Sequence, residues 1–379
     1  MSVRDLAEKW LAAEPDDDIR AELTDLIGSA DLDQRFSGSL TFGTAGLRAA
    51  IGAGPLRMNR LVVRQAAAGL VDHLLAANPD HAERGILIGW DGRRKSEVFA
   101  EDTARVAAAR GMRALLMPSV VPTPVLAWNI ERLGCAAGVM VTASHNPPGD
   151  NGYKVYLDSG AQIVPPDDRS IATAIAQVDP TTVPLADLSD PSIVRLDRSP
   201  IDDYLDWVPS VRLTSGAVRI PFAYTPLHGV GGDTALAAFE RCGIEKPLVV
   251  DRQFVPDGAF PTVAFPNPEE PGAMDAVVEL AAEHGVSLAI AHDPDADRLG
   301  VAVADRQGRW RLLRGDEIGW LLADHIIART SGDDRLIVST VVSSSLVGKM
   351  AAAAGVSYAE SFTGFKWIAE AVRRRPDKR

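Results

Sequence analysis

Apolar positions along the chain repeat with two different periods, and the alternation of these periods predicts the architecture. Apolar residues spaced three and four apart predict helices at 60–77, 96–110, 123–133, 315–329 and 344–354. Apolar runs of strand length lie at 85–91, 113–117, 137–142, 218–225, 246–251, 286–292 and 335–342. Strands that alternate with helices of this length are typical of βαβ units. We therefore expect an α/β protein with largely parallel sheets that are covered on both faces.

Some stretches lack this alternation. Residues up to about 29 have helical spacing that is interrupted at EPDDD (14–18), and 178–200 is rich in Pro, Asp and Ser without a period, which predicts a linker. The last nine residues read as a charged helix end, with no later segment to complete a sheet. We expect three domains, 1–195, 196–308 and 309–379, the third of them incomplete.

Composition narrows the class of protein. The 379 residues include 51 acidic and 39 basic side chains, a formal charge of −12, which argues against a surface for nucleic acid or anionic membrane. The chain has no apolar run of about 20 residues and no signal-like N-terminus, so we expect a cytoplasmic protein. Cys135 and Cys242 lie in apolar surroundings without a zinc-ligand pattern and are expected to be buried, reduced thiols.

Three carboxylates follow a predicted strand at alternate positions in the stretch HDPDADR (292–298). Asp293, Asp295 and Asp297 leave the sheet where open α/β sheets bind ligands. Their mutual repulsion favours a bound cation. The glycine and glutamate that a calcium-binding EF-hand loop requires at its sixth and twelfth positions are replaced by Arg298 and Ala304. A Mg²⁺ ion shared with a phosphate fits better than calcium, and a solvated acidic loop is the alternative.

A serine loop lies between two apolar runs in TASHNPPGDNG (142–152). Ser144 follows the strand as a nucleophile would, but the G-x-S-x-G pattern of α/β-hydrolases is absent. His145 is adjacent to Ser144, and because adjacent side chains diverge we expect it to contact an anion or substrate rather than Ser144. Lys154 begins the next strand and can return toward the loop. The alternative is a turn with a structural histidine, but beside an acidic Mg²⁺ site the serine is typical of a phosphoryl carrier.

Further loops combine glycine with basic side chains and are candidates for phosphate binding. FGTAGLR (42–48) supplies Thr44, Gly46 and Arg48, DGRRKS (91–96) supplies Arg93, and the TGFK turn (363–366) supplies Gly364 and Lys366. Glycines let backbone N–H groups approach an anion, and arginine binds phosphate with two parallel hydrogen bonds. Each of these loops could also be no more than a turn.

The motifs FGTAGLR, TASHNPPGDNGYK, DPDADR and TGFK, in this order, resemble the α-D-phosphohexomutase superfamily, in particular its phosphoglucomutase and phosphopentomutase-like branch. The resemblance implies consecutive three-layer α/β/α domains with mostly parallel mixed sheets. It implies a Mg²⁺-dependent isomerase that moves a phosphoryl group between C1 and C6, or C5, of a sugar monophosphate. A sugar bisphosphate such as glucose 1,6-bisphosphate is the implied intermediate and activator.

The resemblance also assigns roles to residues of this chain. Ser144 would carry the phosphoryl group and bind the metal through it, beside Asp293, Asp295 and Asp297 as the other ligands. The expected catalytic set is Ser144, His145, Lys154 and Arg48, and the expected substrate-binding set is Thr44, Gly46, Arg93, Arg298, Gly364 and Lys366.

The sugar loop of the third domain and the fourth domain of the superfamily have no counterpart here, so the chain resembles a truncated mutase that would turn over sugar phosphates poorly. Two alternatives remain open. A haloacid-dehalogenase-like phosphatase or mutase would use Asp293 as the nucleophile, although that class expects Thr or Val where this chain has Asp297. A non-catalytic protein that only binds sugar phosphate is the other. The resemblance leaves the oligomeric state open.

Overall fold

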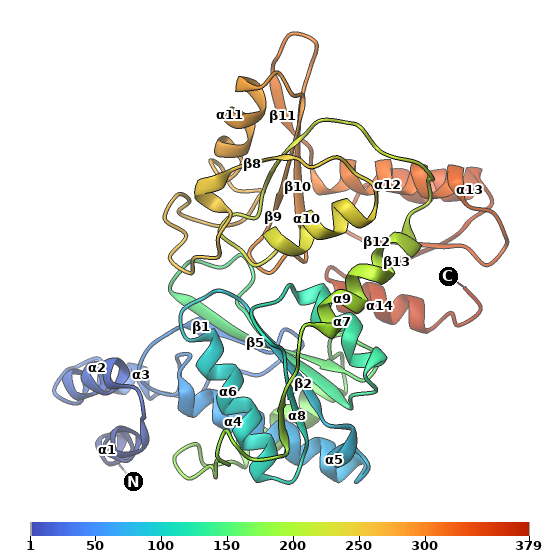
Figure 1. Ribbon diagram of the computed structural model, residues 1–379. Helices are drawn as coiled ribbons and strands as arrows, with labels where there is room; N and C mark the ends of the chain where they lie inside the picture. The colour runs from blue at the N-terminus through green and yellow to red at the C-terminus, as the bar shows by residue number, and fades with distance from the viewer. Residues whose placement is uncertain (1, 379) are drawn as a thin grey trace. The chain divides into compact units, whose positions relative to one another are not determined.

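The computed structural model describes residues 2–378 and divides them into two compact units, each of which is described separately (Figure 1). Unit 1 comprises the chain through Ile201 together with Pro256–Phe265, and unit 2 comprises Asp202–Val255 and the chain from Pro266 onward. Both units have a mixed β-sheet flanked by helices, which confirms the predicted α/β/α class. The predicted domain boundaries at 195/196 and 308/309 stay predictions.

Unit 1 is built on a six-stranded sheet. Its strands lie in the order β1 (Leu47–Ala50), β5 (Asp150–Leu157), β4 (Ala137–Val141), β2 (Ile86–Trp90), β3 (Ala114–Leu116) and β6 (Ile193–Arg195). The strands from β4 to β6 are parallel, whereas β5 runs antiparallel to both β4 and β1. Every residue of β2, β3 and β4 is buried, as expected for strands covered on both faces.

The helices of unit 1 cover both faces of this sheet. The connection through α6 (Ser96–Ala109) leads from β2 to β3, and the connection through α7 (Thr123–Arg132) leads back past β2 to β4. Because such crossovers are right-handed, the reversal of direction places α6 and α7 on opposite faces. α4 (Arg60–Ala77) and α8 (Asp167–Ala176) pack on the α6 side (Figure 1). Four short helices complete the unit: α1 (Val3–Ala13), α2 (Asp17–Ile27), α3 (Leu32–Arg35) and α5 (His81–Arg84).

Unit 2 contains a five-stranded sheet and a separate pair of strands. The larger sheet has the order β11 (Trp310–Leu312), β10 (Leu299–Ala304), β9 (Leu288–His292), β7 (Ala223–Thr225) and β8 (Leu248–Val249). β7, β8 and β9 are parallel, and β10 and β11 are added as antiparallel hairpins. One face packs Phe222 and Tyr224 against Phe239 and other apolar residues of α10 (Gly232–Arg241), and α11 (Asp275–Glu283) packs on the same sheet.

The last part of unit 2 is a two-stranded parallel sheet, β12 (Leu336–Thr340) and β13 (Ser357–Ser361). It is joined by α13 (Leu346–Ala353) and flanked by α12 (Gly315–Arg329) and α14 (Phe365–Arg373). The unit also contains two short 3₁₀ helices, η1 (Val208–Val211) and η2 (Asp251–Gln253), and α9 (Ser199–Trp207) crosses from unit 1 into unit 2.

Three sequence expectations were wrong in detail, and proline explains two of them. The strand predicted at 218–225 is limited to β7, because Pro221 has no N–H to donate and the residues before it are exposed. Pro247 likewise delays the start of the strand predicted at 246–251, and β8 ends at Val249, shortly before η2 begins at Asp251. The stretch 178–200 is not only a linker, since it contains β6, which pairs with β3 at the edge of the sheet.

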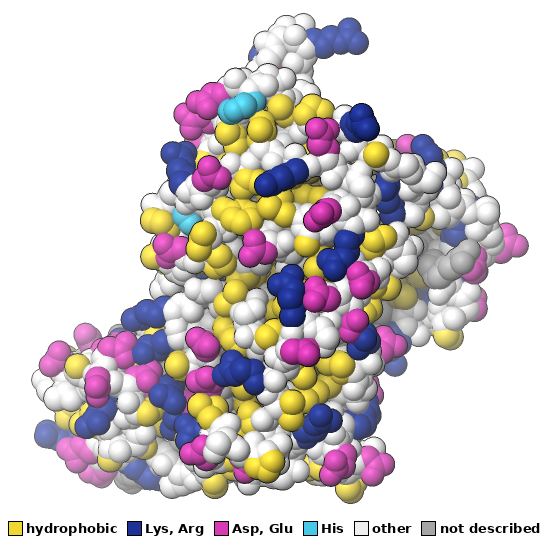
Figure 2. Space-filling view, in the orientation of Figure 1, with side chains coloured by type: hydrophobic (Ala, Val, Ile, Leu, Met, Phe, Trp, Pro, Cys, Tyr) yellow, Lys and Arg dark blue, Asp and Glu magenta, His cyan; other side chains and the backbone are white. Residues whose placement is uncertain are grey.

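Charged side chains of both signs are interspersed over the face of the molecule in Figure 2, so on this face the negative net charge does not gather into one patch. Among residues 2–378, no helix is both long enough and apolar enough to cross a bilayer. Both cysteines are buried and unbridged, as expected.

Candidate active site

The serine loop connects β4 to β5, and Ser144 has an unusual backbone conformation there. Its φ is 53°, in the left-handed region that non-glycine residues seldom occupy, and its N–H donates to Thr142 Oγ1 at 2.8 Å. Ser144 is 1% exposed. A strained, buried serine at a strand end is an arrangement that surrounding contacts must hold in place, as is typical of functional sites.

The strained backbone also places His145 next to Ser144. Ser144 Oγ and His145 Nδ1 lie 3.3 Å apart, so the expectation that these adjacent side chains diverge was wrong. The left-handed turn at Ser144 rotates the following residue and brings the two side chains to the same side of the chain. The imidazole also lies beside the ring of Phe265, with their centroids 6.2 Å apart.

Arg93 holds the serine loop through its backbone. Its Nη2 donates to the carbonyl oxygens of Ser144 at 2.5 Å and Asn146 at 2.6 Å, and its Nη1 donates to those of Pro147 at 2.8 Å and Asp150 at 3.2 Å. The guanidinium is buried and stacks on Phe260, 4.9 Å from the ring centroid. Both terminal nitrogens are thus engaged with the loop, whereas a contact of Arg93 with substrate stays a prediction.

Asp91 supports Arg93 and was not singled out from the sequence. Its carboxylate accepts hydrogen bonds from Ser96 Oγ at 2.6 Å and from the Arg93 N–H at 3.0 Å, and lies 3.4 Å from Arg93 Nε. Burial raises the pKa of Asp91, while the charge of Arg93 and the hydrogen bond from Ser96 act in the opposite direction. The only sequence signal was its position directly after β2.

The glycine-rich loop, 42–48, leads into β1 and contacts the serine loop. Arg48 Nη1 donates to Asn146 Oδ1 at 3.0 Å, and Asn146 Nδ2 donates to Asp150 Oδ2 at 2.8 Å. Thr44 lies in the turn that precedes β1. The structure therefore brings Arg48 into contact with the loop that carries Ser144, through the side chain of Asn146.

Gly46 has a steric reason to be glycine. Its N–H donates to the Gly43 carbonyl at 2.7 Å, and its φ is 74°. A β-carbon at Gly46 would lie 1.8 Å from the carbonyl oxygen of Tyr153. The backbone of the turn is thus used for a tight approach to β5, and a contact of Gly46 with substrate stays a prediction.

Lys154 lies within β5 rather than at its start. The strand begins at Asp150, and Lys154 pairs with Met140 of β4. Lys154 is buried, at 6% exposure. It lies two residues after Gly152, and the Gly152 carbonyl accepts a hydrogen bond from the Thr142 N–H at the base of the serine loop. Lys154 and the serine loop thus belong to the same strand pair.

The acidic loop of unit 2 joins β9 to β10. Asp293 and Asp295 are fully buried, and Asp297 is partly buried. One carboxylate oxygen from each of the three side chains lies within 4.8 Å of the other two. Arg298 donates its N–H to Asp293 Oδ1 at 3.1 Å, and its Nε lies 3.3 Å from Asp297 Oδ1. The structure thus brings the three predicted ligands together with Arg298.

The loop after β7 supports the acidic loop. The Val230 N–H donates to the Pro294 carbonyl at 2.8 Å, and a β-carbon at Gly229 would lie 2.4 Å from Pro294 Cα. Because β7 and β9 are neighbouring parallel strands, their carboxyl ends meet at one edge of the sheet. The stretch 225–232 therefore has a structural role, because it holds the acidic loop in place.

An all-oxygen set of three converging carboxylates fits a hard divalent cation such as Mg²⁺. Without a cation, carboxylates this close to one another repel strongly, and Arg298 neutralises one charge. The residues present therefore fit the ion that the resemblance implies.

Gly364 and Lys366 belong to the third predicted domain. Gly364 has a φ of 118° and precedes α14, and Lys366 lies in the first turn of that helix. Both are contained in unit 2, and their role in substrate binding stays a prediction.

The chain thus has serial α/β/α domains, with a serine loop after one parallel strand and a carboxylate loop after another. Three regions match the phosphoglucomutase/phosphomannomutase α/β/α domains I, II and III, at residues 39–182, 202–308 and 314–376. The chain belongs to the phosphoglucomutase/phosphomannomutase family, within the α-D-phosphohexomutase superfamily.

Individual relatives agree with this assignment. The chain is 43% identical over 314 residues to the "probable phosphomannomutase" of Haemophilus influenzae, covering 82% of this chain and 64% of that protein. It is 37% identical over 399 residues to the phosphoribomutase of Saccharomyces cerevisiae, covering 97% of this chain and 64% of that protein. The chain thus spans less than two thirds of the length of these relatives.

A solved structure supports the fold. The phosphoglucomutase/phosphomannomutase family protein of Burkholderia thailandensis superposes with a TM-score of 0.73 at 22% identity, covering 89% of this chain and 69% of that chain.

Proposed function

We propose that this chain is part of a Mg²⁺-dependent phosphosugar mutase in which Ser144 carries the phosphoryl group. The observation that carries the proposal is the serine loop itself. Ser144 is held in a left-handed turn, in contact with His145, by four carbonyl hydrogen bonds from Arg93. Enzymes gain rate by fixing reacting groups before the reaction, and phosphoryl transfer depends mainly on such positioning and on charge stabilisation.

In the proposed reaction, Ser144 Oγ attacks one phosphorus of a sugar bisphosphate such as glucose 1,6-bisphosphate. The new Oγ–P bond forms as the P–O bond to the sugar breaks, and the serine proton ends on the sugar oxygen. His145, with Nδ1 3.3 Å from Oγ, and Lys154 are the candidates to transfer this proton. Arg48, which contacts Asn146 of the serine loop, is the proposed group that stabilises the negative charge of the phosphoryl group.

The reverse transfer, to a different hydroxyl of the sugar, isomerises a sugar monophosphate. We propose C1 and C6, or C5, as the two positions. Thr44, Gly46, Gly364 and Lys366 are the proposed sugar-phosphate contacts, together with Arg93 and Arg298. The proposed location is the cytoplasm.

Asp293, Asp295 and Asp297 would hold the Mg²⁺ ion. When bound, the ion supplies positive charge that stabilises the transferring phosphoryl oxygens. Arg298, which pairs with Asp293 and Asp297, keeps two of the carboxylates oriented in the meantime. The participation of Ser144 in the metal site, through its phosphate, stays a prediction from the resemblance.

Intact-mass measurement and phosphopeptide mapping test the proposal. The purified chain is incubated with Mg²⁺ and glucose 1,6-bisphosphate, alongside the Ser144→Ala and Asp293→Asn variants. We expect one phosphoryl group on Ser144 of the unchanged chain and none on the Ser144→Ala variant. Phosphorylation that survives Ser144→Ala and maps to Asp293 would instead support an aspartyl mechanism. Sugar-phosphate binding without any phosphorylation would support a non-catalytic binding protein.

A further inference from the structure

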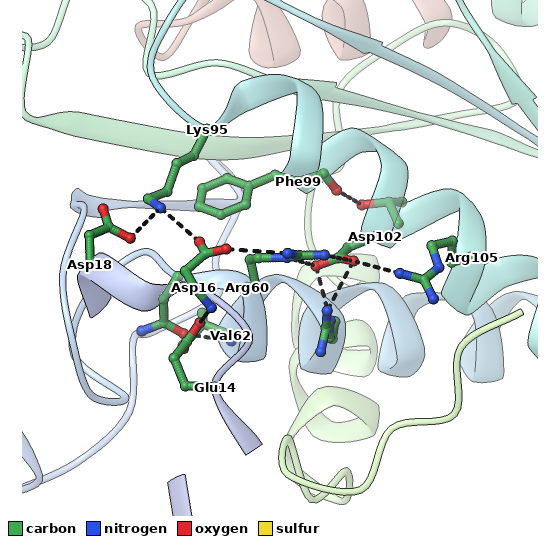
Figure 3. Close-up of polar contacts among 12 residues, drawn as sticks. Glu14, Asp16, Asp18, Arg60, Val62, Lys95, Phe99, Asp102 and Arg105 are labelled. Carbon is green, nitrogen blue, oxygen red and sulfur yellow. Dashed lines mark hydrogen bonds and ion pairs between the residues drawn. The ribbon is translucent and has the colours of Figure 1, made fainter. Parts of the chain in front are cut away.

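Lys95 ties the N-terminal helices to the turn that carries Arg93, and the more exposed Arg94 of the same turn lies 3.5 Å from Asp18. Lys95 Nζ lies 2.8 Å from Asp16 Oδ2 and 2.8 Å from Asp18 Oδ1, at the start of α2 (Figure 3). The side chains of Lys95 and Asp16 are each 13% exposed. Ion pairs shielded from solvent in this way are screened less than pairs on the open surface.

The backbone of Lys95 is held in an unfavourable conformation. Its φ of 66° and ψ of 1° are left-handed, which the β-carbon of a lysine disfavours. The same residue joins the 91–96 turn to α6, because its carbonyl accepts the N–H of Phe99 at 3.0 Å. Such a conformation persists only where tertiary contacts hold it, and the two carboxylates are the contacts of its side chain.

The ion pair between Lys95 and Asp16 continues into a network of charged side chains inside unit 1. Arg60 Nη1 lies 3.2 Å from Asp16 Oδ1, and Arg60 also forms a two-point pair with Asp102 at 2.7 and 2.8 Å. Asp102 is fully buried and also pairs with Arg64. A continuous polar network therefore runs from helices α4 and α6 through Asp16 to Lys95.

Arg93 lies two residues before Lys95 in the same short turn, and it holds the serine loop by four carbonyls. Displacement of the turn would move the guanidinium away from these oxygens. We propose that Lys95 is a positioning residue, through which Asp16 and Asp18 of the N-terminal helices hold the serine loop ready to accept a phosphoryl group. The inference rests on the proposed role of Ser144, but the order of the loop can be measured without any reaction.

The test compares four variants with the unchanged chain. Lys95→Met removes the charge and keeps the stem, and Lys95→Arg restores a cation. Asp18→Asn removes one partner of Lys95, a half-exposed carboxylate that also lies 3.5 Å from Arg94 Nη1. Lys9→Met is the matched control, because Lys9 also ties the N-terminal helices to the rest of unit 1, through Asp179 at 2.5 Å, but lies outside the 91–96 turn.

The first measurement is hydrogen exchange of the serine-loop amides in the absence of ligand, followed in peptides covering 143–152. Two of these amides, those of Asn146 and Asp150, donate within the loop. We expect about fivefold faster exchange in Lys95→Met, a smaller increase in Asp18→Asn, and unchanged exchange in Lys95→Arg and Lys9→Met. Exchange in Lys95→Met equal to that of the unchanged chain would overturn the inference.

The second measurement is the rate of phosphoryl acceptance by Ser144 from glucose 1,6-bisphosphate. For Lys95→Met we expect about a tenfold lower maximal rate at an unchanged half-saturating donor concentration, with rescue by Lys95→Arg. A raised half-saturating concentration with a normal maximal rate would contradict a positioning role. If the unchanged chain accepts no phosphoryl group, the proposed function fails, and hydrogen exchange still decides whether Lys95 orders the loop.

Discussion

At the scale of single residues, the two glycines of the FGTAGLR turn offer a matched pair. Gly46→Ala places a β-carbon against the Tyr153 carbonyl at a φ of 74°, whereas a β-carbon at Gly43 meets no atom within 4 Å. We expect Gly46→Ala to lower the free energy of unfolding by about 3 kcal/mol, and Gly43→Ala to change it by less than about 1 kcal/mol. Urea unfolding of both variants checks this prediction, and equal effects would contradict it.

A second prediction at this scale concerns pH. Burial raises the pKa of Glu14 to about 7, although a hydrogen bond from the Asp16 N–H acts against the shift. A carboxyl group whose pKa is raised on folding stabilises the fold below its unfolded pKa, near 4.5, and loses that contribution as the pH rises through 7. Relative to Glu14→Gln, the unchanged chain should therefore lose about 3 kcal/mol of stability between pH 5 and pH 8. Urea unfolding measures the free energy of unfolding of the two proteins at each pH. The same pH dependence in both would exclude this role of Glu14.

At the scale of elements, α4 and α6 are joined by a buried ion cluster. Asp102 on α6 is fully buried between Arg60 and Arg64 of α4, so Asp102→Asn removes the carboxylate partner of the buried Arg64 and one of the two partners of the partly buried Arg60. We expect a loss of about 3–5 kcal/mol in the free energy of unfolding. The control is Asp72→Asn, which removes the half-exposed partner of Arg110 and should cost less than about 1 kcal/mol. Thermal or urea unfolding distinguishes the two, and a small loss for Asp102→Asn would show that the cluster is dispensable.

The elements also show what the sequence can predict. The helices predicted at 60–77 and 315–329 have the bounds of α4 and α12, because long helical periods leave little ambiguity. The strand β6 was missed, since three residues among prolines and aspartates carry no period and gain their pairing only from β3. At the candidate site, the motifs identified Ser144 and the three aspartates, but the contact of Arg93 with loop carbonyls depends on tertiary geometry that no local pattern encodes.

At the scale of the whole molecule, a divalent cation should stabilise the chain through the acidic loop. Under the proposed function Mg²⁺ would bind only the folded arrangement of Asp293, Asp295 and Asp297, so a concentration of about 100 times its Kd should add about 2.7 kcal/mol. Melting curves with and without Mg²⁺ should show this shift, and Asp295→Asn should abolish most of it. Asp324→Asn, at an exposed carboxylate on α12, is the control that should retain it. An equal shift in Asp295→Asn would place the ion elsewhere.

The chain path has a consequence for biosynthesis. Unit 1 contains the first 201 residues, but it also requires the segment 256–265, which supplies Phe260 against Arg93 and Phe265 beside His145. A ribosome that has completed the first sheet must add roughly 60 more residues before these rings exist, which takes on the order of several seconds at about 5–20 residues per second. During that interval the nascent chain has Ser144 but lacks two of its neighbouring rings. The serine loop should therefore reach its final order only after the first segment of unit 2, Asp202–Val255, has been translated.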